Sequence, residues 1–181
     1  MENDGDLDIY QTNGWPDWAE FGSFPTDQTR VFESNGDGTF VDSAIPLGLN
    51  DTQQGRGIVC ADFDNDGDVD VLQLHLDTTL AATLWVNTLN TNNYLKVKLL
   101  GAAPNTEAVG ARIYATSGGK EQMREVNLGS NFASHNPTVQ HFGLGASAQV
   151  DTLRIVWPDG SETVQQSVSA NQEVIVAQPG S

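Results

Sequence analysis

Five aspartates crowd the stretch DFDNDGDVDV at residues 62–71. Four of them hold positions 1, 3, 5 and 9 of a DxDxDGxxD loop, with a glycine where the chain turns sharply: Asp62, Asp64, Asp66 and Asp70. Each pair of such carboxylates repels by about 3 kcal/mol at ~5 Å and an effective dielectric of ~20, so the cluster implies a cation. Several hard oxygen ligands on a flexible loop favour Ca²⁺ over Mg²⁺.

Asp68 is the fifth aspartate, at position 7 of the loop. We expect it to offer its backbone carbonyl to the ion and to turn its side chain to solvent. An EF-hand is excluded because position 12 is Gln73 instead of Glu, and because strands flank the loop. The alternative to a calcium loop is a solvated Asp/Asn/Gly turn.

The loop has a second, shorter copy. NDGDLDI at residues 3–9 repeats NDGDVDV at residues 65–71, so the chain contains a repeated supersecondary unit. Glu2, Asp4 and Asp8, with the carbonyl of Asp6, form a candidate partial calcium site, and a frayed acidic terminus is the alternative. Because residue 1 falls inside the motif, we expect the chain to be the C-terminal piece of a longer array.

Composition excludes several classes of protein. The 181 residues carry a formal charge of −16, which repels nucleic acid and anionic lipid and attracts cations. No run approaches the roughly 18 apolar residues that a membrane-spanning helix needs. MENDGDLDIY lacks the basic and apolar regions of a signal peptide. We therefore expect no membrane span and no nucleic-acid partner.

Short runs of alternating apolar residues recur along the whole chain, whereas helical spacing is almost absent. Asn, Asp and Gly pairs between the runs supply tight turns. The pattern predicts an all-β protein with strands at residues 7–11, 29–34, 39–43, 57–63, 69–76, 83–87, 94–101, 110–116, 122–128, 139–144, 151–157, 162–166 and 173–177.

Composition changes near residue 90. The acidic turns lie before it, and basic residues such as Lys96, Lys98 and Arg112 lie within predicted strands after it. The polar stretch NTLNTNN is the best candidate linker. We therefore divide the chain into residues 1–89 and residues 90–181.

Few residues suggest catalysis. Ser134 and His135 are adjacent, with Asp151 nearby in sequence, but neighbours on a strand point to opposite faces and cannot pair as nucleophile and base. His141 lacks a second His or Cys close in sequence for a metal site and is expected on a half-exposed strand. Cys60 is interpreted as a small buried hydrophobe, since one cysteine forms no internal disulfide. We expect no enzyme.

The tryptophans leave open whether the chain binds a glycan. Trp15 and Trp18 lie in a predicted loop, where they could form an aromatic platform for a glycan or pack between sheets. Trp85 and Trp157 lie in strand patterns and are expected in the core.

Residues 1 to about 89 resemble the FG-GAP/VCBS repeats that form β-propeller blades. NDGDLDIYQTNG, TRVFESNGDGTF and GIVCADFDNDGDVDVLQLH follow the family's order of strand, hairpin and calcium loop. Residues 93–177 resemble the ASPIC/UnbV domain through NYLKVKLLG, AVGARIYATSGGKEQMREVNLG, HFGLG, VDTLRIVWPDG and ANQEVIV.

The resemblance implies a C-terminal fragment of a β-propeller, about one and a half blades, followed by a β-sandwich-like domain. It also implies calcium ligands at Asp62, Asp64, Asp66, Asp68 and Asp70. The function it implies is a secreted or cell-surface adhesion or recognition module with a protein or glycan ligand. The alternative is the accessory end of a secreted carbohydrate-active or other extracellular enzyme.

A blade that stands alone exposes an apolar face and an unpaired strand edge. The sandwich-like domain can cover one side of the blade. We expect the other side to meet a second copy of the chain through residues 1–89, most simply as a two-fold dimer.

Overall fold

The protein is described by a computed structural model that covers residues 1–14, 26–76, 81–89 and 92–180. Trp15 and Trp18, the candidate glycan platform, lie outside these described residues. Within them all regular structure is β-strand, which confirms the predicted all-β class. The described part of the chain contains no helix of the length and apolar character needed to cross a bilayer.

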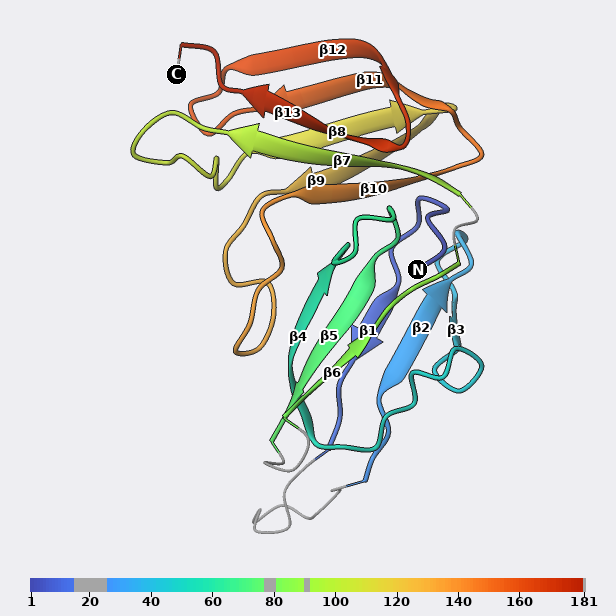
Figure 1. The fold of residues 1–181 in the computed structure, drawn as a ribbon. Helices are drawn as coiled ribbons and strands as arrows, with labels where there is room; N and C mark the ends of the chain where they lie inside the picture. Colours follow the sequence, from blue (N-terminus) through green and yellow to red (C-terminus); the bar gives the residue numbers. More distant parts are fainter. Residues whose placement is uncertain (15–25, 77–80, 90–91, 181) are drawn as a thin grey trace.

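The first part of the chain forms two three-stranded antiparallel sheets, each a meander (Figure 1). One sheet contains β1 (Ile9–Gln11), β2 (Arg30–Ser34) and β3 (Phe40–Asp42) in that order. The other contains β4 (Gly55–Ala61), β5 (Asp70–His75) and β6 (Ala82–Trp85). Strands that follow one another in the chain are neighbours in each sheet, so the strand order follows the sequence.

The two sheets meet face to face. Tyr10 of β1 lies with its ring 6.4 Å from that of Trp85 on β6, and its hydroxyl donates to Gln73 Oε1 at 2.9 Å. Val31 is fully buried in the small apolar cluster beside them. Trp85 packs against this cluster, as predicted for a strand tryptophan.

The second part of the chain is a two-layer sandwich. One layer has the order β10-β7-β13 and the other the order β12-β11-β8-β9, and only the β13–β7 pair is parallel. The bounds of these strands are β7 Asn93–Leu100, β8 Arg112–Ser117, β9 Lys120–Glu125, β10 Gln140–Gly145, β11 Gln149–Val156, β12 Glu162–Ser169 and β13 Gln172–Ala177.

The sandwich has the larger core. Leu95, Val97 and Leu99 alternate inward along β7, as a strand with one buried face requires. Trp157 is 2% exposed and donates its indole N–H to Thr163 Oγ1 at 2.9 Å, so the predicted core role is confirmed. The opposite face of β7 carries Tyr94, Lys96 and Lys98, and part of it turns toward the first two sheets.

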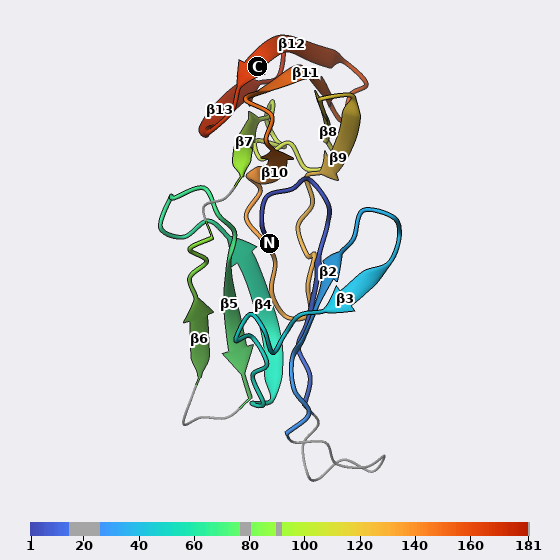
Figure 2. The same cartoon turned by 90° about the vertical axis from the view of Figure 1, so that its right-hand side faces the viewer.

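A loop of the sandwich covers the free edge of β4. It descends between β9 and β10 and runs beside β4 (Figures 1 and 2). Ser134 Oγ accepts from the Ile58 N–H at 2.9 Å and donates to the Ile58 carbonyl at 2.7 Å. Asn136 Oδ1 accepts from the Cys60 N–H at 2.9 Å, and Asn131 Nδ2 donates to the Ile58 carbonyl at 2.9 Å. Polar side chains thus replace a neighbouring strand.

Replacing Ser134 by alanine should lower the free energy of unfolding by about 1–3 kcal/mol, because the half-buried Ile58 N–H loses its acceptor, while the Ile58 carbonyl keeps only Asn131 as a donor. Urea denaturation measures the loss, and hydrogen exchange should show faster exchange at the Ile58 amide. His135→Ala, at the exposed neighbouring position, is the matched control. Equal stability of the two variants would contradict the edge-capping role.

Candidate metal centre

The backbone of the acidic loop is held by its own carboxylates. Asp64 Oδ1 accepts from the Asp66 N–H at 3.2 Å, and Asp66 Oδ1 accepts from the Asp68 N–H at 2.9 Å. Gly67 has a φ of 98°, a left-handed conformation that costs a glycine little. Its N–H donates to Asp62 Oδ2 at 3.1 Å. The loop therefore wraps around its carboxylates.

Asp70 closes the loop onto the sheet. It is fully buried, and its two oxygens accept from the Phe63 N–H at 2.8 Å and from the Asn87 N–H at 2.7 Å. These bonds hold one carboxylate at the start of β5, beside the chain that leaves β6. Asp70 is therefore fixed before any ion arrives.

Three carboxylates converge at this loop. Asp62, Asp64 and Asp70 each place one oxygen within 4.8 Å of the others. The Asp62 side chain is 3% exposed, and its Oδ1 atom is buried with no hydrogen-bond partner. A buried carboxylate oxygen is costly when unsatisfied, and a bound cation would satisfy it. Loss of hydration, then repulsion from Asp66, Asp70 and Asp62, raises the pKa of Asp64. The donor set fits a hard divalent cation.

The two remaining predicted ligands lie differently. Asp66 and Asp68 do not join the three-carboxylate cluster. The expectation that the Asp68 side chain points to solvent is wrong. Asp68 is 3% exposed, and its Oδ1 accepts from Asn3 Nδ2 at 2.8 Å. The first copy of the repeat therefore packs on the second, and its Asn3 side chain binds the Asp68 carboxylate.

The outer face of the sandwich layer contacts the same loop. Lys96 Nζ of β7 donates to Asp62 Oδ2 at 2.7 Å, and their side chains are 11% and 3% exposed. His141, paired with Lys96 in the sheet, lies 3.0 Å through Nε2 from the Gly67 carbonyl and stacks on Tyr94. A Cβ at Gly67 would overlap the Tyr94 ring, so this position needs glycine for space as well as conformation.

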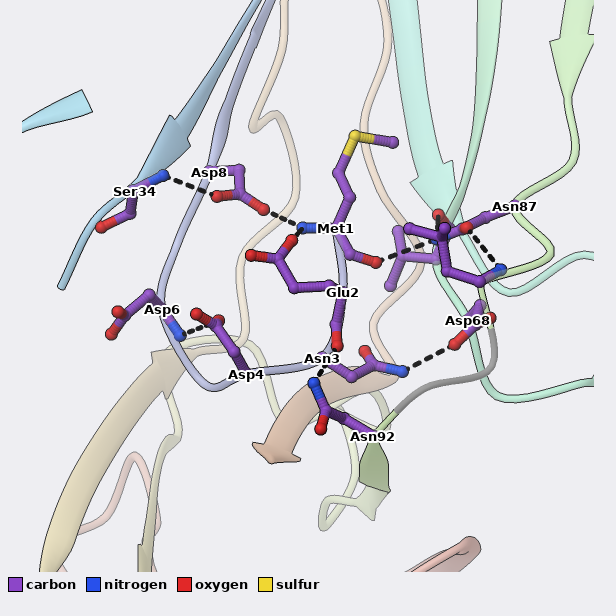
Figure 3. Close-up of polar contacts among 12 residues, drawn as sticks. Met1, Glu2, Asn3, Asp4, Asp6, Asp8, Ser34, Asp68, Asn87 and Asn92 are labelled. Carbon is purple, nitrogen blue, oxygen red and sulfur yellow. Dashed lines mark hydrogen bonds and ion pairs between the residues drawn. The ribbon is translucent and has the colours of Figure 1, made fainter. Parts of the chain in front are cut away.

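The first copy of the loop keeps the backbone of the second without gathering its carboxylates (Figure 3). Asn3 and Gly5 have φ of 57° and 94°, like 63° and 98° at Asn65 and Gly67. In the described residues only the second loop brings three metal-ligating groups together. The first-loop candidates have other partners: Glu2 and Asp8 pair with the N-terminal ammonium, Asp6 with Lys120, and Asp4 with the Asp6 N–H.

Position 9 of the motif has the same structural task in both copies. Asp8 Oδ1 accepts from the Ser34 N–H at 3.0 Å, as Asp70 Oδ1 accepts from that of Asn87. Each bond joins the start of one strand to the end of the next. An aspartate here is therefore explained by backbone satisfaction even in the copy without a cluster.

The residues considered for catalysis have separate partners. Ser134 contacts the backbone of β4, His135 Nδ1 lies 3.0 Å from the Asn136 carbonyl, and Asp151 Oδ2 accepts from the Gly118 N–H at 3.1 Å. Burial raises the pKa of the Cys60 thiol to about 11, which keeps it protonated and unreactive.

A cavity of about 520 Å³ opens between the two sheets and the sandwich. Tyr10, Val31 and Val71 contribute apolar wall, and Arg124 and Asn136 contribute polar groups. The Arg124 guanidinium lies 5.1 Å over the Phe142 ring, and burial lowers its pKa. No local sequence pattern indicates this cavity, because its walls come from all four sheets.

Known proteins match the two parts of the chain separately. Residues 1–72 match the family described as FG-GAP-like repeat, and residues 101–181 match the family described as ASPIC and UnbV. Cartilage acidic protein 1 of Homo sapiens is 51% identical over 43 residues, which are 23% of this chain and 6% of that protein. The Xenopus tropicalis protein of the same name is 51% identical over 43 residues, 7% of its length.

The chain thus spans a small part of these relatives. Among solved structures, the major pilin subunit of Bacillus cereus is 13% identical, over 61% of this chain and 36% of that one. Its TM-score of 0.25 is too low to carry an argument about the fold. The family matches confirm the resemblance drawn from the motifs: residues 1–72 are an FG-GAP-like repeat segment, and residues 101–181 are an ASPIC and UnbV domain.

Proposed function

We propose that this chain is a non-catalytic, calcium-binding recognition module of an extracellular protein. The observation that carries the calcium site is the buried, unpartnered Oδ1 of Asp62, on a side chain that converges with those of Asp64 and Asp70. Asp62, Asp64 and Asp70 would hold the ion, with Asp66 and the Asp68 carbonyl as further ligands. The ion would neutralise the loop and fix its shape.

Recognition, instead of catalysis, is supported by the partners of the polar groups. Ser134 and Asn136 are used to cap β4. The cavity between the sheets and the sandwich offers both apolar wall and polar groups to a ligand. The extracellular setting is supported by the two families and by the millimolar calcium for which acidic loops of this kind are suited. The ligand would be a protein or a glycan.

Calcium titration of chelator-treated protein tests the site directly. Calorimetry should show one ion bound per chain, and Asp64→Ala should abolish the heat without unfolding the protein, because Asp64 is exposed. At about 100 times the dissociation constant, calcium should stabilise the fold by about 2.7 kcal/mol, so a chelator should lower the melting temperature.

Asp37→Ala is the control for loss of an exposed carboxylate, since Asp37 lies in the NGDG turn and accepts from the Thr39 N–H at 2.9 Å. It should leave calcium binding unchanged. A flat titration of the unmodified chain, or an unaltered one in Asp64→Ala, would refute the calcium site.

Lys96 supplies a second prediction, because its ammonium competes with the ion for Asp62. Replacing Lys96 by methionine removes a positive charge beside a ligand carboxylate, and calcium should bind about tenfold tighter or more. Without calcium the same variant should be less stable by about 1–3 kcal/mol, since a buried carboxylate loses its partner. Competition with a chromophoric chelator and thermal melts measure the two effects.

Lys98→Met is the matched control, two residues along the same face of β7. It should change neither calcium affinity nor the difference in melting temperature with and without calcium. Weaker calcium binding in Lys96→Met would mean that the lysine positions Asp62 for the ion instead of competing with it.

A further inference from the structure

β12 forms an edge of the sandwich on the side away from the first two sheets (Figures 1 and 2). It is eight residues long and pairs only with β11. Glu162 is its one charged residue, and it contains no lysine or proline. Natural edge strands are protected by such residues, by a short length or by a cover. β12 therefore has few of the usual defences against pairing with another strand.

Other sheet edges of this chain are protected. β9, at the opposite edge of the same sheet, carries four charged residues among its six, and β1 and β3 have three residues each. Ser134 and Asn136 cap the edge of β4, and Gln122 donates to the Gly143 carbonyl of β10 at 2.7 Å. In the part of the chain that the structure describes, nothing bonds the backbone at the outer edge of β12 in this way.

The register of the β11–β12 hairpin shows which backbone groups of β12 point outward. The Trp157 N–H donates to the Ser161 carbonyl at 2.9 Å, so these two residues form a hydrogen-bonded pair. Such pairs alternate along an antiparallel ladder, so β12 bonds β11 through Ser161, Thr163 and Gln165. The regular ladder ends at Ser167, whose φ is 55°. The N–H and C=O groups that point to the free edge are therefore those of Glu162, Val164 and Gln166.

These three residues are complementary to a second copy of themselves. In an antiparallel pair with Val164 opposite its own equivalent, Glu162 of each copy lies opposite Gln166 of the other. No like charges then face each other, and Val164, which is 50% exposed, is covered by an apolar side chain. Each opposed pair can exchange two backbone hydrogen bonds. A register with Glu162 opposite its own equivalent would instead oppose two carboxylates and leave Val164 and Gln166 unpaired.

We propose that β12 pairs with β12 of a second copy, antiparallel about a two-fold axis at Val164. The four-stranded layers of the two copies then join into one continuous sheet, with the order β9-β8-β11-β12-β12-β11-β8-β9. The same strand meets itself, so the contact closes after two copies. It is separate from the association through residues 1–89 that the sequence suggests, which remains a prediction, and it does not depend on calcium.

A residue at a two-fold axis meets its own copy, which allows a test by charge. Val164→Lys alone and Val164→Glu alone should each be monomeric, because like charges then meet at the axis. An equal mixture of the two should restore the dimer, because a lysine faces a glutamate. Val164 is half exposed, so neither change should unfold the chain, which a thermal melt checks. Met123→Lys and Met123→Glu, at a 48% exposed position of β9 on the opposite edge, are the matched controls.

Sedimentation velocity measures the association from roughly 10 µM to roughly 1 mM, because a contact through one strand is small and is expected to bind weakly. Salt at about 0.15 M screens the repulsion between chains of charge −16 beyond ~8 Å. The unmodified chain and both Met123 variants should form dimers as concentration rises. Gln166→Lys places a lysine opposite Glu162 of the second copy and should tighten the dimer about threefold to tenfold.

Three results would overturn the proposal. A monomeric unmodified chain over the whole range would show that the edge of β12 takes no second copy. Association that persists unchanged in Val164→Lys would place the contact elsewhere, for example in residues 1–89 or at β13. A mixture of the two Val164 variants that stays monomeric, while the unmodified chain forms dimers, would exclude an axis at this residue.

Discussion

The buried carboxylate of Asp62 imposes the constraint on which the relative placement of the two parts depends. A charged group that is 3% exposed needs a compensating partner, and Lys96 provides it from a strand of the other part, 34 residues along the chain. His141 and Tyr94 follow Lys96 to the loop because they share its face of the sandwich layer. The acidic loop is therefore both the candidate metal centre and the point where the sandwich docks.

Polar side chains, chiefly asparagines, join the N-terminal segment to the acidic loop and to the residues that follow β6. Asn3 donates to Asp68 and to the Gly67 carbonyl, Asn87 to the Met1 carbonyl, and Asn92 to the Glu2 carbonyl. An amide both donates and accepts, so it can satisfy a loop backbone that has no ladder partner. The contact between the two sheets instead combines an apolar cluster around Val31 with the hydrogen bond from Tyr10 to Gln73.

The two copies of the motif show which aspartates have structural tasks. Position 9 is occupied in both copies because it fastens the end of the next strand, through Asp8 to Ser34 and through Asp70 to Asn87. Asp64 has no such repeated task, since its equivalent Glu2 pairs with the N-terminal ammonium. The convergence of Asp64 with Asp62 and Asp70 is therefore the feature that singles out the second loop for an ion.

Local structure follows from the order of the residues. Alternation of apolar residues placed each observed strand, because the period of two is a property of consecutive residues. Spacing singled out the five aspartates of residues 62–70, of which Asp62, Asp64 and Asp70 converge. Three contacts depend on how distant segments pack: Asp68 is buried under Asn3, Lys96 reaches Asp62, and Ser134 caps β4. Those contacts join residues 34 to 76 positions apart, and no local pattern encodes which distant surfaces meet.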